Sequence, residues 1–553
     1  MRFYSLLIIA LFIGSQPAGA QQKDIVKSSG IHSMFHQDHV GQILFTTRDI
    51  PLKTLNQKNV VSNYRLTNKS NLFMNAFLVN SLTNELHRLA PRLTADSLVK
   101  VGNFQFTLYV DHHLIYQSNL HPGAPSAKTK DTATIFAEPL IDNDHENALW
   151  SQYFWGRFMY GGGDSVLTEG RHLLRLEIRP YIQSGGLKTG RVIAAGELHL
   201  LVYRKPKVDI SRISLSPVRP YDGFAISSEK FNTGKLKELK GNIDAAVFKK
   251  ITSIAVIKNG KLLVEEYFNG LTRDSLHDPR SVGKSFSSTL TGIAIADHYL
   301  KSEDEPIKDF YDLKSFDNYS PLKNEVTLKD LLTMSAVFDG NDEDGNSPGA
   351  EDNMYPTPNW VKFALDLPVN TTKPKEQWHY FTAGVILLGD VLNKTVPGGL
   401  EKYADQKLFQ PLHITHYQWP YTPQHVPNTA GGILMKTLDF AKYGQLYQNN
   451  GEWNGRQLIP KTWVAKTLSR QKAIPGRLNE FYGYLFWNKT YTVAGKDYET
   501  YYCAGNGGNS IFIFKNQPWV IVITATAYGA PYAHLQVDRM MQNYLLPAIL
   551  NIK

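Results

Sequence analysis

A serine and a lysine three residues apart, Ser281 and Lys284, are the pair in this sequence best suited to chemistry. Side chains at this spacing face the same side of a helix, so the lysine amine can reach the serine hydroxyl. The positive end of a helix disfavours an ammonium and aims backbone N–H groups at a developing oxyanion. The pair therefore predicts a serine nucleophile activated by a lysine. Taken alone, the two residues are more typical of an ordinary helix start with Ser281 as its cap.

Two later segments favour the catalytic interpretation. A Tyr-Phe-Thr segment lies at 380–382, and a glycine-rich Asn-Gly-Gly segment lies at 506–508. Together with the Ser-x-x-Lys pair, the Leu-Leu-Thr segment within 328–335 and Gly-Gly-Ile at 431–433, and in this order along the chain, they resemble the motifs of serine β-lactamases and penicillin-binding proteins. The resemblance covers about 220–553. It points to the class C branch, on the side of esterases and amidases related to 6-aminohexanoate-dimer hydrolase.

This resemblance implies a role for each matching residue. Ser281 would be the acylated nucleophile and Lys284 its proton partner. Tyr380 would be the shared base or acid, with the nearby lysine charge favouring its phenolate. The second oxyanion N–H would come from Asn509. The remaining residues of the substrate site would be Thr382, whose hydroxyl could hold Lys284 or substrate, and Asn506, Gly507 and Gly508.

Two positions depart from the family's pattern. Asn506 stands where β-lactamases have a lysine, so a fixed positive charge is missing where β-lactams and peptide C-termini place a carboxylate. Thr382 stands in place of the usual asparagine or serine. Both changes argue against an efficient penicillinase and favour an esterase or amidase.

Other polar segments give weaker signals. Residues 283–285 do not end a phosphate-binding loop, because Asp278 stands where that motif needs a glycine. The Asp-His-His cluster at 111–113 predicts a hairpin turn rather than a metal site. The acidic stretch 339–352 does not fit a calcium loop and is interpreted as exposed; if it rims the site, it would select cationic or sugar-like substrates. Cys503 is the only cysteine and lies in an apolar run, so we expect a packed residue without a disulfide.

The hydrophobic pattern predicts two domains. Residues 24–205 contain short strands, among them an alternating run at 104–110 that forms a hairpin with 114–116, and predict an all-β, sandwich-like domain. Residues 206–220 are rich in proline and predict a linker.

The second predicted domain covers 221–553. It begins and ends with strand patterns and has helices between, which predicts an α+β architecture: one antiparallel sheet flanked by helices, plus a helical lobe. Helices are expected near 281–300, 328–335, 357–366, 383–393, 399–408, 437–449, 460–468 and 533–549.

The first twenty residues predict export. Arg2, the apolar run 6–13 and the small residues at 18–20 are typical of a cleaved signal peptide, although a buried N-terminal strand is the alternative. Gln21 rather than cysteine follows the cleavage site, so no lipid anchor is expected, and no other segment predicts a membrane span. The mature protein is expected in the periplasm or outside the cell.

The leading hypothesis is an exported serine hydrolase that cleaves an ester or amide through an acyl-enzyme on Ser281, without a metal or cofactor. One alternative is a cell-wall D,D-peptidase or weak β-lactamase; another is a non-catalytic protein that binds an envelope polymer. The net charge of +9 is scattered and predicts no nucleic-acid site. The sequence leaves open the substrate, the role of the β domain and the oligomeric state.

Overall fold

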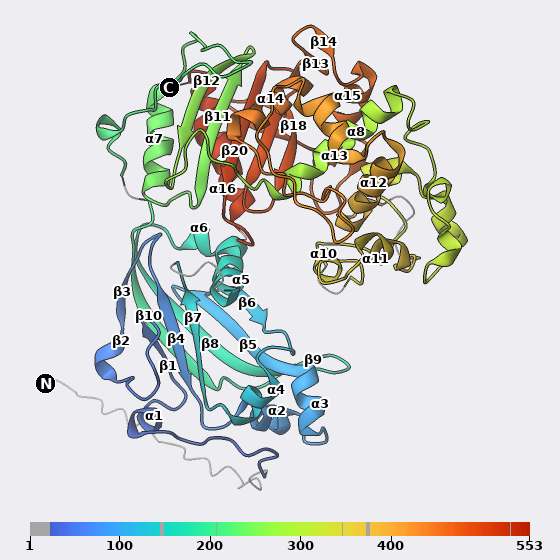
Figure 1. The fold of residues 1–553 in the computed structure, drawn as a ribbon. Helices are drawn as coiled ribbons and strands as arrows, with labels where there is room; N and C mark the ends of the chain where they lie inside the picture. Colours follow the sequence, from blue (N-terminus) through green and yellow to red (C-terminus); the bar gives the residue numbers. More distant parts are fainter. Residues whose placement is uncertain are drawn as a thin grey trace, which may run out of the picture. The chain divides into compact units, whose positions relative to one another are not determined.

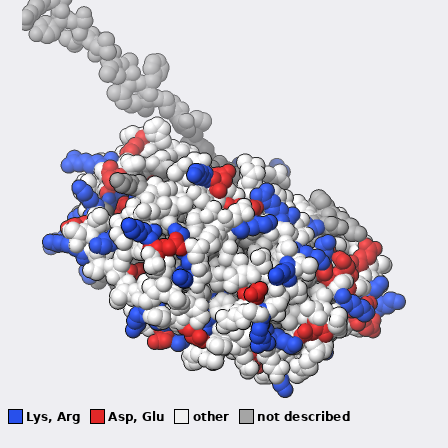
Figure 2. Space-filling model, turned by 90° about the horizontal axis from the view of Figure 1, so that it is seen from above, with Lys and Arg blue, Asp and Glu red and all other residues white. Residues whose placement is uncertain are grey.

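The computed structural model divides the chain into two compact units, Met1–Arg204 and Lys205–Lys553 (Figure 1). It describes residues 23–143, 149–205, 207–344, 347–371, 377–530 and 532–552. The predicted signal peptide lies outside the described residues. Within the described ranges, no helix is both long and apolar enough to cross a membrane. On the face shown in Figure 2, basic and acidic side chains are interspersed, as the scattered charge in the sequence predicts.

The N-terminal unit is built on two sheets. The first has the strand order β2-β1-β4-β7; the second has the order β3-β10-β8-β5-β6, with β9 paired to β8. All these pairings are antiparallel except that of β3 with β10. The strands are β1 (Ile43–Thr46), β2 (Val60–Val61), β3 (Asn63–Leu66), β4 (Leu72–Phe77), β5 (Gly102–Val110), β6 (His113–Asn119), β7 (Ile135–Ile141), β8 (Gly170–Gln183), β9 (Leu187–Thr189) and β10 (Ala194–Val202).

The predicted hairpin is present as β5 and β6. Asp111 and His112 form its turn and both adopt a left-handed backbone, with φ of 49° and 69°. The Asp111 carboxylate accepts a hydrogen bond from Leu173 N at 2.8 Å and lies 2.7 Å from His172 Nδ1 on β8. Among the described residues no cluster of His, Cys, Asp and Glu could hold a metal ion. The Asp-His-His cluster therefore fixes the turn to the neighbouring strand.

The N-terminal unit also contains helices that the sequence analysis did not predict, so the all-β description is incomplete. Two of them begin with a capping side chain: Ser81 accepts from Asn84 N, and Thr94 accepts from Ser97 N. Each helix is too short to show a clear period of 3.6 in its apolar residues, so the hydrophobic pattern of the sequence does not predict it. The helices are α1 (Met34–Asp38), α2 (Leu82–Leu89), α3 (Ala95–Val101), α4 (Ala127–Thr132), α5 (Leu149–Phe158) and α6 (Asp164–Val166).

The C-terminal unit contains one antiparallel sheet with the order β12-β11-β20-β19-β18-β17-β16-β15, as predicted. Strand β11, near the start of the unit, pairs with β20, near its end, so the sheet joins distant segments (Figure 1). Its strands are β11 (Ile251–Lys258), β12 (Lys261–Tyr267), β15 (Lys472–Ala473), β16 (Phe481–Tyr482), β17 (Trp487–Val493), β18 (Lys496–Gly505), β19 (Asn509–Phe514) and β20 (Trp519–Ala525). A small separate hairpin consists of β13 (Glu452–Trp453) and β14 (Arg456–Gln457).

The predicted helices of this unit are all present, and the described residues contain two further helices that were not predicted, α7 (Thr233–Asp244) and α10 (Glu351–Met354). Helix α14 packs on the central strands, and Phe286 of α8 stacks on Tyr443 of α14 with ring centres 4.0 Å apart. In Figure 1, α10, α11 and α12 gather on the side of the unit opposite β12 and form a helical lobe. The helices are α8 (Lys284–Ala296), α9 (Leu328–Leu332), α10 (Glu351–Met354), α11 (Trp360–Asp366), α12 (Thr382–Thr395), α13 (Leu400–Ala404), α14 (Thr437–Gln448), α15 (Lys461–Thr467), α16 (Ala533–Met540) and α17 (Leu546–Ile549).

The segment predicted as a linker lies against the C-terminal unit. Val208 and Ile213 pack so closely on α7 that a side chain at Gly241 would collide with both. Further along, the backbone N–H and the hydroxyl of Ser216 donate to the carboxylate of Glu266 on β12, at 2.6 and 2.9 Å. This segment is therefore anchored to the second unit rather than free.

Candidate active site

Ser281 lies in a single 3-10 turn, η4 (Arg280–Gly283), that leads directly into α8. The preceding Arg280 has a φ of 51°, which is an unfavourable backbone conformation for a residue with a side chain. Its N–H donates to Asp278 Oδ1 at 2.9 Å, and its guanidinium contacts the same carboxylate at 3.2 Å and lies over the ring of Tyr528 at 4.3 Å. These contacts hold the strained turn that carries the serine.

Lys284 is the first residue of α8 and only 2% exposed. Its Nζ lies 2.7 Å from Ser281 Oγ and donates to the carbonyl oxygen of Ala430, also at 2.7 Å. The two side chains therefore meet as their spacing predicts. The carbonyl of Ala430 is a partner that the sequence analysis missed, because it lies 146 residues away in the chain.

Tyr380 lies two residues before α12, with its ring 5.2 Å from Lys284 Nζ. Burial raises the pKa of its phenol, and this effect outweighs the lowering by the charge of Lys284 and by a hydrogen bond with Ser281. The charge of Lys284 therefore acts in the predicted direction, and burial opposes it. The ring is fixed by stacking on Trp487, with centres 5.6 Å apart.

Two glycines, Gly505 and Gly431, pack closely against η4, the turn that carries Ser281. A Cβ added at Gly505, the last residue of β18, would lie 1.9 Å from the carbonyl oxygen of Pro279 and 3.1 Å from Ser281 N. A Cβ at Gly431 would lie 2.5 Å from the carbonyl oxygen of Arg280 and 3.1 Å from Ser281 N. Only glycine fits at either position, since any side chain would displace the serine. The glycine-rich segments of the sequence therefore have a direct role in placing Ser281.

The predicted third segment forms the turn between β18 and β19. Gly507 and Gly508 have φ of 91° and 94°, values that glycine adopts readily. Asn506 is exposed, and its Oδ1 accepts a hydrogen bond from Gly529 N at 2.8 Å. This asparagine directly follows Gly505, the residue that touches Ser281.

Asn509, predicted as the second oxyanion donor, is built into the sheet. It is 1% exposed and stands opposite Gly505 in the register of β18 and β19. Its Nδ2 donates to the carbonyl oxygens of Asn506 and Ala525 at 2.9 and 3.0 Å, and its Oδ1 accepts from Ala525 N at 3.0 Å. The side chain of Asn509 thus ties the turn to β20.

Thr382 does not contact Lys284 in the way that the sequence analysis allowed. It is fully buried, and its hydroxyl has no hydrogen-bond partner of normal geometry among the described residues. The hydrogen bonds of Lys284 go instead to Ser281 and to the carbonyl of Ala430. The backbone N–H of Thr382 donates to Asp342 Oδ2 at 2.8 Å.

The acidic stretch 339–352 was expected to be an exposed loop, and for part of it this is wrong. Glu343 and Asp352 are exposed, whereas Asp342 is half-buried beside Tyr380 and Thr382. Burial raises the pKa of Asp342 to about 6; the negative charge of Glu351 acts in the same direction, and hydrogen bonds from Thr382 and the charge of Lys284 oppose it. No local pattern identifies Asp342, because its partners lie in other segments.

Cys503 is a packed residue, as predicted. It is fully buried on β18 opposite Ile511 of β19. Burial raises the pKa of its thiol to about 12, which removes the thiolate that a nucleophile would need.

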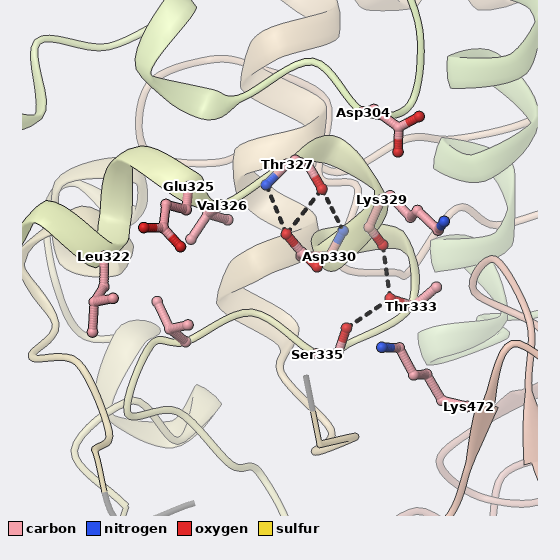
Figure 3. A pocket seen from close by; sticks show the side chains of 11 residues that line it. Asp304, Leu322, Glu325, Val326, Thr327, Lys329, Asp330, Thr333, Ser335 and Lys472 are labelled. Atoms are coloured by element: carbon pink, nitrogen blue, oxygen red, sulfur yellow. Dashed lines mark hydrogen bonds between the residues drawn. The ribbon is translucent and has the colours of Figure 1, made fainter. Parts of the chain in front are cut away.

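A cavity of about 290 Å³ lies beside α9 (Figure 3). Four of its polar side chains bond in pairs: the hydroxyl of Thr327 donates to Asp330 Oδ2 at 2.9 Å, and the hydroxyls of Thr333 and Ser335 lie 2.8 Å apart. The cavity lining includes neither Ser281 nor any other residue predicted for the site. It is therefore separate from the candidate active site.

Comparison with known proteins places residues 244–541, more than half of the chain, in the family model described as Beta-lactamase. No curated protein matches the sequence. Among solved structures, a candidate 6-aminohexanoate-dimer hydrolase from Bacillus anthracis is 18% identical, with 54% of this chain and 80% of that chain covered and a TM-score of 0.46. An octameric penicillin-binding protein homologue from Pyrococcus abyssi is 20% identical, with 56% and 79% covered and a TM-score of 0.44. A D-stereospecific amidohydrolase from Streptomyces sp. is 15% identical, with 53% and 93% covered and a TM-score of 0.41.

Proposed function

Because the chain belongs to the serine β-lactamase family, we propose that it is an exported hydrolase that cleaves an ester or an amide through an acyl-enzyme on Ser281. The observation that carries the proposal is the 2.7 Å contact between Lys284 Nζ and Ser281 Oγ at the start of a helix, with Tyr380 beside both. This arrangement supplies a nucleophile and two proton-transfer groups at one place.

Acylation begins from the neutral amine of Lys284: Ser281 Oγ attacks the carbonyl carbon, and the serine proton passes to that amine. The carbonyl oxygen becomes an oxyanion, and its collapse breaks the bond to the leaving alcohol or amine. Tyr380, a neutral phenol in the resting site, donates the proton that the leaving group needs and regains one from Lys284. A single net proton thus moves from the serine to the leaving group.

Deacylation runs the same path with water in place of the serine. Water attacks the acyl carbon and gives up a proton through Tyr380 and Lys284, and Ser281 Oγ leaves with that proton restored. The acid product is released, and the three side chains return to their starting states.

The oxyanion needs two N–H donors. The first is the N–H of Ser281, at the helix start. For the second, the contact between Gly505 and Ser281 supports the N–H of Asn506, the next residue along the chain, in place of that of Asn509. Asn506 is exposed to a bound substrate, whereas Asn509 is buried within the sheet.

The charges around the site favour a neutral or cationic substrate. Because Asn506 stands in place of the family's lysine, the positive charge that this lysine would supply is absent. The carboxylates of Asp342 and Glu351 lie close enough to Tyr380 to raise the pKa of its phenol. A substrate carboxylate would be repelled there. An ester or amide without that group fits better than a β-lactam.

Labelling with a fluorophosphonate tests the proposal. We expect one covalent adduct on Ser281 in the wild type and none in Ser281→Ala, detected by mass spectrometry of the intact protein and its peptides. Turnover of p-nitrophenyl esters and of a linear amide, measured beside penicillin, separates an esterase or amidase from a peptidase or β-lactamase. An unlabelled wild type that binds peptidoglycan as well as Ser281→Ala does would support a non-catalytic binding protein instead.

Export has its own test. Expression in a Gram-negative host, followed by fractionation and N-terminal sequencing, should give a mature protein that begins at Gln21. An unprocessed protein that stays in the cytoplasm would contradict the exported assignment while leaving the chemistry untouched.

A further inference from the structure

Asp342 joins three parts of the C-terminal unit beside the proposed active site, and the mechanism above gives it no role. Its backbone N–H donates to the carbonyl oxygen of Tyr380 at 2.8 Å. Its Oδ2 accepts a hydrogen bond from Thr382 N at 2.8 Å, and its Oδ1 accepts one from Glu351 N at 2.8 Å. Thr382 and Glu351 are the first residues of α12 and α10.

Both helices lack a cap of their own. The residue before α12 is Phe381 and the residue before α10 is Ala350, and neither provides a side-chain hydrogen bond to the helix. The first N–H groups of a helix need an acceptor, and a carboxylate there is further stabilised by the positive end of the helix. One carboxylate, Asp342, meets this need for both helices from a loop that belongs to neither.

We propose that Asp342 is a positioning residue for catalysis: its ionised carboxylate fixes the start of α12, and with it the place of Tyr380 relative to Lys284 and Ser281. This inference rests on the proposed function, because it gives Asp342 a role only if Tyr380 transfers protons. Two hydrogen bonds hold the backbone at Tyr380 and just after it. Asp342 N donates to the Tyr380 carbonyl oxygen, and Thr382 N donates to the Asp342 carboxylate. Loss of the carboxylate would remove the second of these hydrogen bonds.

Both oxygens of Asp342 are strong acceptors only while the carboxyl group is ionised. Protonation converts one oxygen into a hydroxyl group, which is a much weaker acceptor for an N–H group. Burial raises the pKa of Asp342 to about 6, so this change falls within an accessible pH range. Lys284 of α8 favours the ionised form and Glu351 of α10 opposes it, while Tyr380 and Tyr355, whose phenol pKa values are raised by burial, stay neutral throughout that range.

The experiment measures the first-order rate of fluorophosphonate labelling of Ser281 at saturating probe, from pH 5 to 8. In the wild type we expect the rate to fall about tenfold from its plateau on going one pH unit below the pKa of Asp342. Asp342→Asn should label at least tenfold more slowly at pH 7, show no acid limb near pH 6 and bind the probe with a similar affinity. Asp342→Glu should keep the limb.

The matched control is Asp352→Asn, which removes an exposed carboxylate from the first turn of α10 and should behave as the wild type. A wild-type rate and pH profile in folded Asp342→Asn would overturn the inference. If thermal unfolding shows that Asp342→Asn does not fold, the wild-type protein provides the test. A wild-type labelling rate that does not change between pH 5 and pH 8 would also overturn the inference. An unlabelled wild type would instead reject the proposed function itself.

Discussion

Gly505→Ala is the substitution with the most direct structural consequence for the proposed chemistry. The new Cβ would lie 1.9 Å from the carbonyl oxygen of Pro279 and 3.1 Å from Ser281 N, and real Cβ contacts essentially never fall below 3.0 Å. Both partners are backbone atoms, so no flexible side chain can yield. The nucleophile turn or the end of β18 must therefore move by about 1 Å.

A displacement of this size at a reacting group costs about 10²-fold in rate. Overpacking of a well-packed region also costs about 1–3 kcal/mol of stability. We therefore expect Gly505→Ala to fold, to unfold at a somewhat lower temperature and to lose about 10²-fold in the rate of Ser281 labelling by a fluorophosphonate. The effect on labelling should exceed what the stability loss explains, because a folded population remains at the assay temperature.

Gly495→Ala is the matched control. Gly495 lies in the turn between β17 and β18 with a φ of 73°, and nothing lies within 4 Å of an added Cβ. Strain in the left-handed backbone should lower its stability by about 1–2 kcal/mol, but labelling should match the wild type. A labelling rate for Gly505→Ala within threefold of the wild type would refute the argument that Gly505 places the nucleophile.

Three further predictions follow from the same structure. Lys284→Met should lower the rate at which a fluorophosphonate labels Ser281 by about 10²–10⁴-fold. The control Lys442→Met replaces an equally buried lysine and should lower only the unfolding temperature. Equal labelling rates for the wild type and Lys284→Met would contradict a role for this lysine. Burial lowers the pKa of His277 to about 4, so between pH 6.5 and pH 4 the unfolded state binds a proton that the folded state does not. The free energy of unfolding should therefore fall by about 3 kcal/mol as the pH is lowered over that range. Urea unfolding of His277→Gln should show a correspondingly weaker dependence of this free energy on pH. Cys503 should not react with a thiol reagent in the native protein and should react once on unfolding; fast native modification would show that β18 opens.

The elements predicted most reliably were those whose signal is local. The hairpin of β5 with β6 follows from alternation of apolar residues around a short polar turn, and the predicted helices of the C-terminal unit follow from a period near 3.6. The short helices of the N-terminal unit were missed because they span only one to three turns. Their capping residues, such as Ser81 and Thr94, were the available signal.

The candidate site divides in the same way. Lys284 and Ser281 are three positions apart in one helical turn, so their spacing alone was enough to predict the contact between them. The carbonyl of Ala430 and the carboxylate of Asp342 could not be predicted, because their partners are 146 and 40 residues away. The raised pKa of Tyr380 could not be predicted for a related reason: the lysine charge is visible in the sequence, whereas the burial that outweighs it is not.

By itself, the sequence determined the order of the motifs, the residues that we propose as reacting groups and most of the strands and helices that carry them, because each of these depends on neighbours along the chain. Only the tertiary structure decided which backbone groups surround Ser281, that burial raises the pKa of Tyr380, and that an aspartate in an acidic loop caps two helices at once. Those features depend on desolvation and on contacts between distant segments, and both arise only when the sheet and the helical lobe pack together.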